Sequence, residues 1–203
     1  MEIIKKIDFE MAHIVRNAWS QRCSKSIHGH TYTAELFFSR TKYHNPPKPN
    51  MDNGQMVVDF GLISKFIKPY IDSFDHATLL WEKDEDDIKL FFRQHFDRVI
   101  ICPESSSCET MSVLFLEAIN LILDQLREEH IAEMTNYFDN VICHKVIIHE
   151  TKSGRAEADL NSCWRMNNRM KNAAIGTWFS LGIKNEWTNE FKEIWKKACQ
   201  EKY

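Results

Sequence analysis

The sequence predicts an α+β fold in which the elements follow the order strand, strand, helix, helix, strand, strand. Apolar residues alternate with polar ones over residues 2–12 and 30–40, which is the period of strands with one buried face. Apolar residues recur at helical spacing over 62–74 and again over 108–128. With 203 residues the chain can bury a sizeable core as one domain, or as one domain with an appendage.

Two further strands are expected at 140–149 and 156–160, joined by a turn at Ser153-Gly154. Residues 41–55 contain three prolines and an Asn53-Gly54 step, so they predict a hairpin-like connection.

A short strand is expected over 56–60, with Asp59 as the N-cap of the helix that follows and Gly54 as a turn residue. Residues 99–102 predict another short strand.

Two segments carry no residue pattern that points to chemistry. The acidic run at 82–87 is typical of a solvated loop or a helix start, and residues 165–203 include a helix expected from about 186 to 201. For this C-terminal segment and for 82–98, the alternatives are packing over a sheet edge or subunit surface and binding of another protein.

The charge pattern argues against a nucleic-acid partner, because 26 basic and 29 acidic residues are interspersed without a basic stripe. The N-terminus lacks the apolar region of a signal peptide, and no run approaches the roughly 18 apolar residues of a membrane span. We therefore expect a cytoplasmic protein without a membrane partner. Its six cysteines are scattered, which favours free thiols over disulfides.

The strongest candidate site is formed by His13 and the run His28-Gly29-His30. In an antiparallel strand pair, the end of the first strand lies beside the start of the second, so His13 is expected near the other two. Side chains two residues apart share a face, so His28 and His30 can point the same way. Among nine histidines a chance His-x-His is unsurprising, but the third histidine favours a metal site.

Cys23 lies in the loop between these strands and can fold over the three histidines. A structural zinc site closes all four positions, whereas three histidines leave one open for water or substrate. The pattern therefore predicts a catalytic zinc site with a thiol beside it.

Further motifs follow one another along the chain. They are Ala12-His13, Cys23, His28-Gly29-His30-Thr31-Tyr32, Gly54-Gln-Met-Val-Val-Asp59-Phe60, Asp75-His76, Ser107-Cys108-Glu109 and His149-Glu150-Thr151. With them the chain resembles the 6-pyruvoyltetrahydropterin synthase family, which includes bacterial 6-carboxytetrahydropterin synthases of queuosine biosynthesis.

The resemblance covers roughly residues 1–160 and implies the tunnelling fold, a four-stranded antiparallel sheet with two helices on one face. Residues 161–203 would form a C-terminal helical extension. The resemblance also implies a homohexamer, a dimer of trimers, with active sites between subunits.

The resemblance further implies a role for each site residue. His13, His28 and His30 would bind Zn²⁺, and Cys23 would accept a proton, helped by Asp75 and His76. Adjacency in sequence does not by itself make Asp75 the partner of His76, so that partner is left open.

Glu150 would anchor the pterin ring of the substrate, 7,8-dihydroneopterin triphosphate, because one carboxylate accepts hydrogen bonds from the ring N–H and the exocyclic amine. Ser107 and Glu109 match the turn that lines the pterin pocket in the family, although Glu109 also suits the first turn of a helix.

The spacing between Cys23 and His28 leaves the product open. Four residues separate them, between the three usual in the carboxytetrahydropterin synthases and the five of the animal pyruvoyl enzymes. We favour the 6-carboxy product, formed with loss of triphosphate and acetaldehyde. The alternatives are the 6-pyruvoyl product, a catalytically silent pterin- or metal-binding protein, and a zinc hydrolase. Iron, cobalt or nickel would also suit three imidazoles.

Overall fold

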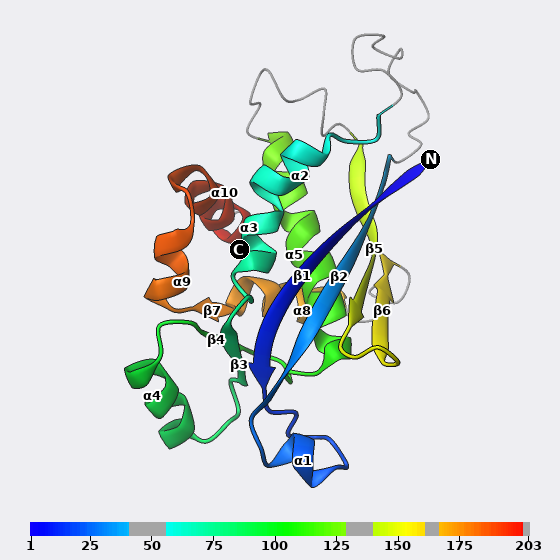
Figure 1. The fold of residues 1–203 in the computed structure, drawn as a ribbon. Helices are drawn as coiled ribbons and strands as arrows, with labels where there is room; N and C mark the ends of the chain where they lie inside the picture. The colour runs from blue at the N-terminus through cyan, green and yellow to red at the C-terminus, as the bar shows by residue number, and fades with distance from the viewer. Residues whose placement is uncertain (41–55, 129–139, 161–166, 201–203) are drawn as a thin grey trace.

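One seven-stranded sheet organises the chain in a computed structural model, which describes residues 1–40, 56–128, 140–160 and 167–200 (Figure 1). The strand order is β6-β5-β2-β1-β3-β4-β7. The strands are β1 (Glu2–His13), β2 (His28–Arg40), β3 (Ala77–Trp81), β4 (Val99–Cys102), β5 (Val141–His149), β6 (Arg155–Asp159) and β7 (Trp178–Phe179).

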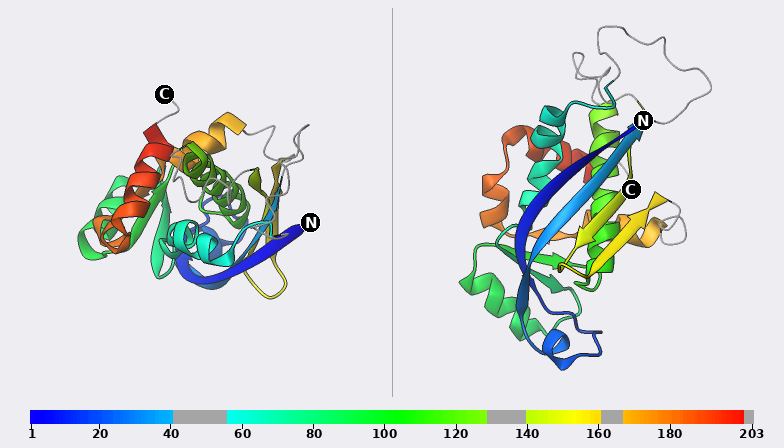
Figure 2. Two further views of the ribbon diagram at one scale, coloured as in Figure 1. Left: turned by 90° about the horizontal axis from the view of Figure 1, so that it is seen from above. Right: turned by 45° about the vertical axis from the view of Figure 1, so that its right-hand side comes forward.

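The long helix α5 is central among the helices that cover the main core face of this sheet (Figures 1 and 2). α4 lies on the opposite face, where its Phe92 packs against Leu80, Val99 and Ile101. α5 packs against β5 and β6, and α8 and α10 pack against it. The described helices are α1 (Gln21–Ser24), α2 (Phe60–Phe66), α3 (Lys68–Asp72), α4 (Asp86–His95), α5 (Cys108–Glu128), α8 (Asn167–Gly176), α9 (Leu181–Glu186) and α10 (Asn189–Gln200). Within the described ranges, no helix is long and apolar enough to cross a membrane.

The expected strands at 2–12, 30–40, 140–149 and 156–160 are present as β1, β2, β5 and β6, and they pair antiparallel. The expected four-stranded sheet is nevertheless wrong for the whole chain. β3 and β4 extend it by parallel pairing beyond β1, and β7 adds an antiparallel edge strand.

Of the added strands, β4 confirms the strand expected over 99–102, whereas β3 and β7 were not expected. β3 pairs with β1 over only three residues, Met11 to His13, and β4 is four residues long and fully buried. A short strand buried on both faces shows no alternation, and parallel pairing depends on segments distant in sequence. The acidic run at 82–87 leads into α4, with two acidic residues in its first turn, where they oppose the positive end of the helix dipole.

The strand expected over 56–60 is absent. Val57 and Val58 are buried in the core, but the segment is the approach to α2 rather than a strand. The Asp59 cap is confirmed, since its carboxylate accepts a hydrogen bond from the Gly61 N–H at 2.5 Å. The expected single helix is divided into α2 and α3 because Pro69, in the first turn of α3, cannot donate the hydrogen bond of a continuous helix. The turn expected at 41–55, with Gly54, lies outside the described residues.

The C-terminal segment shares the core of the preceding chain. β7 pairs with β4, and α10 packs on α5. The helix expected from 186 begins at Asn189, after the separate short helix α9. The buried apolar side chains of residues 178–200 belong to the main core cluster. They are Phe179, Ile183, Trp187, Phe191, Ile194, Trp195 and Ala198.

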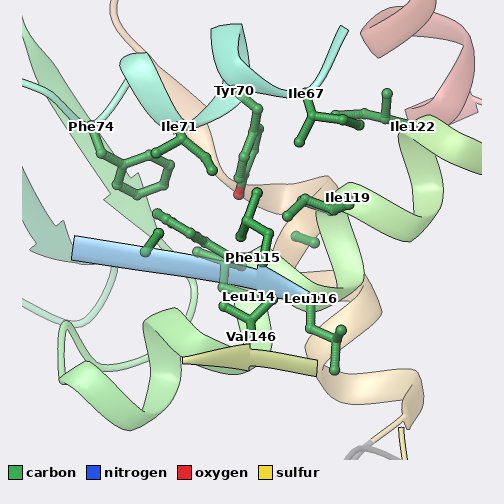
Figure 3. Close-up of a cluster of buried hydrophobic side chains, with 14 of the residues drawn as sticks. Ile67, Tyr70, Ile71, Phe74, Leu114, Phe115, Leu116, Ile119, Ile122 and Val146 are labelled. Carbon is green, nitrogen blue, oxygen red and sulfur yellow. The ribbon is translucent and has the colours of Figure 1, made fainter. Parts of the chain in front are cut away.

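Tyr70 stands at the centre of this shared core (Figure 3). Its ring packs against those of Phe74, Phe115 and Trp195, with ring centroids 5.1–5.7 Å apart. The side chain is fully buried, and its hydroxyl has no hydrogen-bond partner among the described residues. A buried donor without a partner costs free energy relative to its hydrated state.

We expect Tyr70→Phe to raise the free energy of unfolding by about 1 kcal/mol, because it removes the unpaired hydroxyl and keeps the ring. Urea unfolding of the metal-free protein measures this. Tyr32→Phe is the matched control, since the equally buried Tyr32 hydroxyl lies 3.2 Å from His13 Nε2, and its removal should lower stability. Equal losses in both variants would contradict the explanation.

Candidate functional site

The ends of β1 and β2 bring the three predicted histidines together. His13 pairs with His28 across the strands, and His30 lies opposite Met11, so all three imidazoles project from the same face. Their nearest ligand nitrogens all lie within 4.8 Å of one another. The ring of His13 is buried, whereas those of His28 and His30 are half-buried and border a cavity.

Backbone carbonyls orient two of the rings. His13 Nδ1 lies 2.7 Å from the Ser106 carbonyl oxygen, and His28 Nδ1 lies 3.1 Å from that of Ser26. A carbonyl only accepts hydrogen bonds, so each Nδ1 is the protonated donor and each Nε2 keeps a free lone pair. Such outer hydrogen bonds fix the tautomer of metal-binding histidines.

Burial lowers the pKa of His13 to about 4, although the hydrogen bond to Ser106 opposes the shift. Nearby His28 and His30 add to the lowering. The His13 ring is therefore neutral at neutral pH, as a metal ligand must be. Three converging imidazoles fit zinc and leave one coordination position for an oxygen ligand.

Gly29 allows β1 and β2 to approach closely between the histidines. A Cβ atom built at this position would lie 3.1 Å from the Met11 carbonyl oxygen, closer than ordinary contact. The residue between His28 and His30 is thus restricted by the backbone opposite it.

A cavity of about 790 Å³ opens beside the histidines. It gathers residues from segments far apart in sequence, namely the loop after β1, the start of β2, the start of α5 and the β5–β6 turn. The lining residues are Val15, Asn17, Ala18, Cys23, His28, His30, Ser105, Ser107, Cys108, Glu109, Glu150, Thr151, Gly154, Arg155 and Ala156.

Cys23 reaches this cavity from α1, a single turn within the loop that joins β1 to β2. The Val15 N–H donates to the Cys23 carbonyl at 2.9 Å, which holds the two sides of the loop together. Cys23 is half-buried and lines the same cavity as His28 and His30.

Glu150 follows β5, where its N–H donates to the Gly154 carbonyl and begins the turn to β6. Its Oε1 lies 3.6 Å from His13 Nε2 and accepts a hydrogen bond from the Tyr32 hydroxyl at 3.4 Å. Burial, followed by the nearby Glu150 charge, raises the pKa of Tyr32 well above its ordinary value. Tyr32 therefore stays a protonated donor toward the carboxylate.

Ser107 and Glu109 both line the cavity at the start of α5. The Ser107 hydroxyl accepts from the Thr110 N–H at 3.3 Å, so it also caps the helix. Glu109 lies in the first turn of α5, as expected for a capping position.

Asp75 and His76 lie elsewhere. They precede β3, and His76 lines a second hollow with Glu10, Ala12 and Thr31, which alternate along β1 and β2 with the three histidines and so face away from them. His30 borders both this hollow and the first cavity. Asp75 lies 3.0 Å from His76 Nδ1, so the neighbouring residue is the partner that sequence reasoning left open. His76 adopts a φ of 55°, a left-handed conformation that accompanies this contact.

Asp75 is held by the backbone of β1. Its Oδ1 accepts from the Glu10 N–H at 2.8 Å, and the His76 N–H donates to the Glu10 carbonyl at 2.6 Å. Partial burial alone would raise the pKa of Asp75, but the hydrogen bonds from Glu10 and His76 outweigh it and lower the pKa.

Sequence reasoning missed three participants. Ser106 acts through a backbone carbonyl, which leaves no sequence signal. Tyr32 belongs to the quoted motif, but its apolar strand pattern indicates only core packing. Arg155 borders the cavity because it follows the predicted turn beside Glu150. Its position next to that turn could have identified it from the sequence.

Fold and site together define an α+β protein with an open three-histidine centre beside a cavity that carries a thiol and carboxylates. The chain belongs to the 6-pyruvoyl tetrahydropterin synthase family, whose model matches residues 2–161.

Two curated relatives from Helicobacter pylori, strains J99 and 26695, are each named 6-carboxy-5,6,7,8-tetrahydropterin synthase. Each is 30% identical to this chain over 187 residues, covering 92% of this chain and 86% of the relative. A solved 6-pyruvoyl tetrahydropterin synthase from Plasmodium vivax is 16% identical, with a TM-score of 0.48, and covers 78% of this chain and 96% of its own.

We expect His28→Ala to abolish retention of zinc, because two imidazoles alone bind the metal far more weakly than three. After loading and dialysis, wild-type protein should hold about one zinc per chain, and the variant should hold almost none by atomic emission. His144→Ala is the matched control, since that ring pairs with Glu2 at 3.0 Å away from the cavity. Wild-type zinc content in His28→Ala would contradict the site.

Proposed function

We propose that this chain is a zinc-dependent lyase, a 6-carboxy-5,6,7,8-tetrahydropterin synthase. It converts 7,8-dihydroneopterin triphosphate and water to 6-carboxy-5,6,7,8-tetrahydropterin, triphosphate and acetaldehyde, a step in 7-deazaguanine and queuosine biosynthesis. The observation that carries the proposal is the convergence of His28, His30, Cys23 and Glu150 on one cavity. The names of the Helicobacter relatives support the carboxy product over the pyruvoyl product.

In this proposal Glu150 binds the pterin. Its carboxylate accepts from the ring N–H and the exocyclic amine, and the charge on the acceptor strengthens both bonds. Tyr32, which donates to the same carboxylate, limits its rotation. Ser107 and Glu109 border the ring on the α5 side of the cavity.

Cys23 accepts the proton removed from the substrate side chain. Cys23 lines the same cavity as His28, His30 and Glu150. When bound, zinc supplies Lewis-acid polarisation of the side-chain hydroxyls, which acidifies the neighbouring C–H groups.

His76, oriented by Asp75, is the second acid/base group. It lies on the other face of the sheet from the cavity of its own chain, so in this proposal it acts on the cavity of a neighbouring copy. Residues 2–9 of β1 have no partner on the β3 side among the described strands, which leaves an edge for a second chain. A homohexamer built from two trimers would supply this arrangement.

Product analysis tests the reaction. Zinc-loaded protein incubated with 7,8-dihydroneopterin triphosphate should release acetaldehyde and a 6-carboxypterin detected by mass spectrometry. Cys23→Ala should keep its zinc and lose at least 100-fold in kcat, as expected for removal of a general base. A pyruvoyl product would overturn the carboxy assignment, and full turnover in Cys23→Ala would favour a metal-activated water, as in a hydrolase.

Mixed oligomers test the shared site. Cys23→Ala and His76→Asn should each be inactive alone, Asn being chosen because it tolerates the left-handed backbone. Co-expressed and purified through two tags, they should regain about a quarter of wild-type activity, the chance that a wild-type thiol meets a wild-type imidazole of a neighbour. Cys23→Ala mixed with His28→Ala is the control and should stay inactive, because both residues belong to the same chain's cavity. An inactive first mixture would contradict the arrangement.

A further inference from the structure

The loop that carries Cys23 is weakly anchored by packing. α1 contains no buried residue, and Trp19 at the loop tip is fully exposed. Apolar side chains do approach the loop from α4, but a groove of about 420 Å³ lies between Ile14 and Ile27 on one side and Ile88 and Phe91 on the other. The position of the thiol therefore depends on polar contacts.

Arg16 makes the contacts that join this loop to the segment before α4. Its Nε donates to Asp84 Oδ1 at 2.6 Å and its Nη2 to Glu85 Oε2 at 2.9 Å. On the loop side, Nη1 lies 3.5 Å from the Ser24 carbonyl, next to Cys23. Arg16 also follows Val15, whose N–H holds the Cys23 carbonyl.

Asp84 is a rigid acceptor for this arginine. Its side chain is 0% exposed, and its second oxygen accepts from the Trp81 N–H at 2.9 Å at the end of β3. Glu85 is 64% exposed and contributes less, because solvent screens an exposed ion pair. A buried, hydrogen-bonded pair keeps its geometry, and loss of one partner leaves an uncompensated charge.

We propose that the Arg16–Asp84 ion pair is the positioning contact that holds the Cys23 thiol at the wall of the cavity. The segment from 82 to 98, which showed no chemical pattern in sequence, thereby acts as a strap that ties the thiol loop to the sheet (Figure 1). Arg16 and Asp84 are positioning residues, since neither lines the cavity that holds Cys23. The effect on turnover rests on the proposed function; the effect on thiol position does not.

Arg16→Gln, Asp84→Asn and the double variant that carries both remove the ion pair and so test the strap. In the zinc-loaded protein, Arg16→Gln and Asp84→Asn should lower kcat at least tenfold and leave KM and zinc content within twofold, because the thiol shifts while the residues around Glu150 do not. Arg16→Lys should recover part of kcat, since one ammonium still reaches Asp84. Asp86→Asn is the matched control and should match wild type, because Asp86 is 99% exposed and makes no contact with Arg16.

Alkylation of Cys23 by iodoacetamide at pH 7.5, followed by peptide mass spectrometry, reports thiol position without turnover. The rate should rise at least threefold in Arg16→Gln and in the double variant, and stay unchanged in Asp86→Asn. The double variant contains no buried unpaired charge, so it remains informative if the single variants fail to fold.

Wild-type kcat and alkylation rate in the folded double variant would overturn the strap. If the wild-type protein does not turn over the pterin substrate but alkylation still accelerates in these variants, the proposed function fails and the strap stands. An unchanged alkylation rate together with a loss of zinc would show that Arg16 stabilises the metal site instead, and this result would also overturn the strap.

Discussion

Antiparallel pairing of β1 with β2 is the interaction on which the rest of the structure depends. All twelve residues of β1 pair with β2, and the register places His13 opposite His28. The same register aligns the apolar side chains of both strands on one face, where α5 and its neighbours cover them. One set of backbone hydrogen bonds therefore fixes both the core face and the direction of the three imidazoles.

Elements with a regular spacing of apolar residues were predictable from the sequence. The two long strands, α5 and the β5–β6 hairpin follow from apolar spacing, and the approach of His13 to His28 follows from strand pairing alone. β4 was expected as a short strand over 99–102, but β3 and the parallel pairing of both strands were not predictable, because their partners are distant in sequence.

The residues of the site also divide into those that the sequence could place and those that it could not. His28 and His30 share a face for a reason that the sequence displays, whereas the face occupied by His76 depends on the parallel docking of β3 beside β1. Likewise, the acidic run that holds Asp84 resembles a solvated segment in sequence. Only the tertiary structure shows that this carboxylate is buried against Arg16 while its neighbours remain in solvent.

The register of β1 and β2 also has an evolutionary consequence. Inserting or deleting one residue within β1 would turn every following side chain, His13 included, to the opposite face, so the three imidazoles could no longer converge. The loop between the strands has no such alternation, so its length can change during evolution while the three histidines keep facing the same side of the sheet. Lineages of this fold can therefore vary the distance from Cys23 to His28 while the strands themselves keep a constant length.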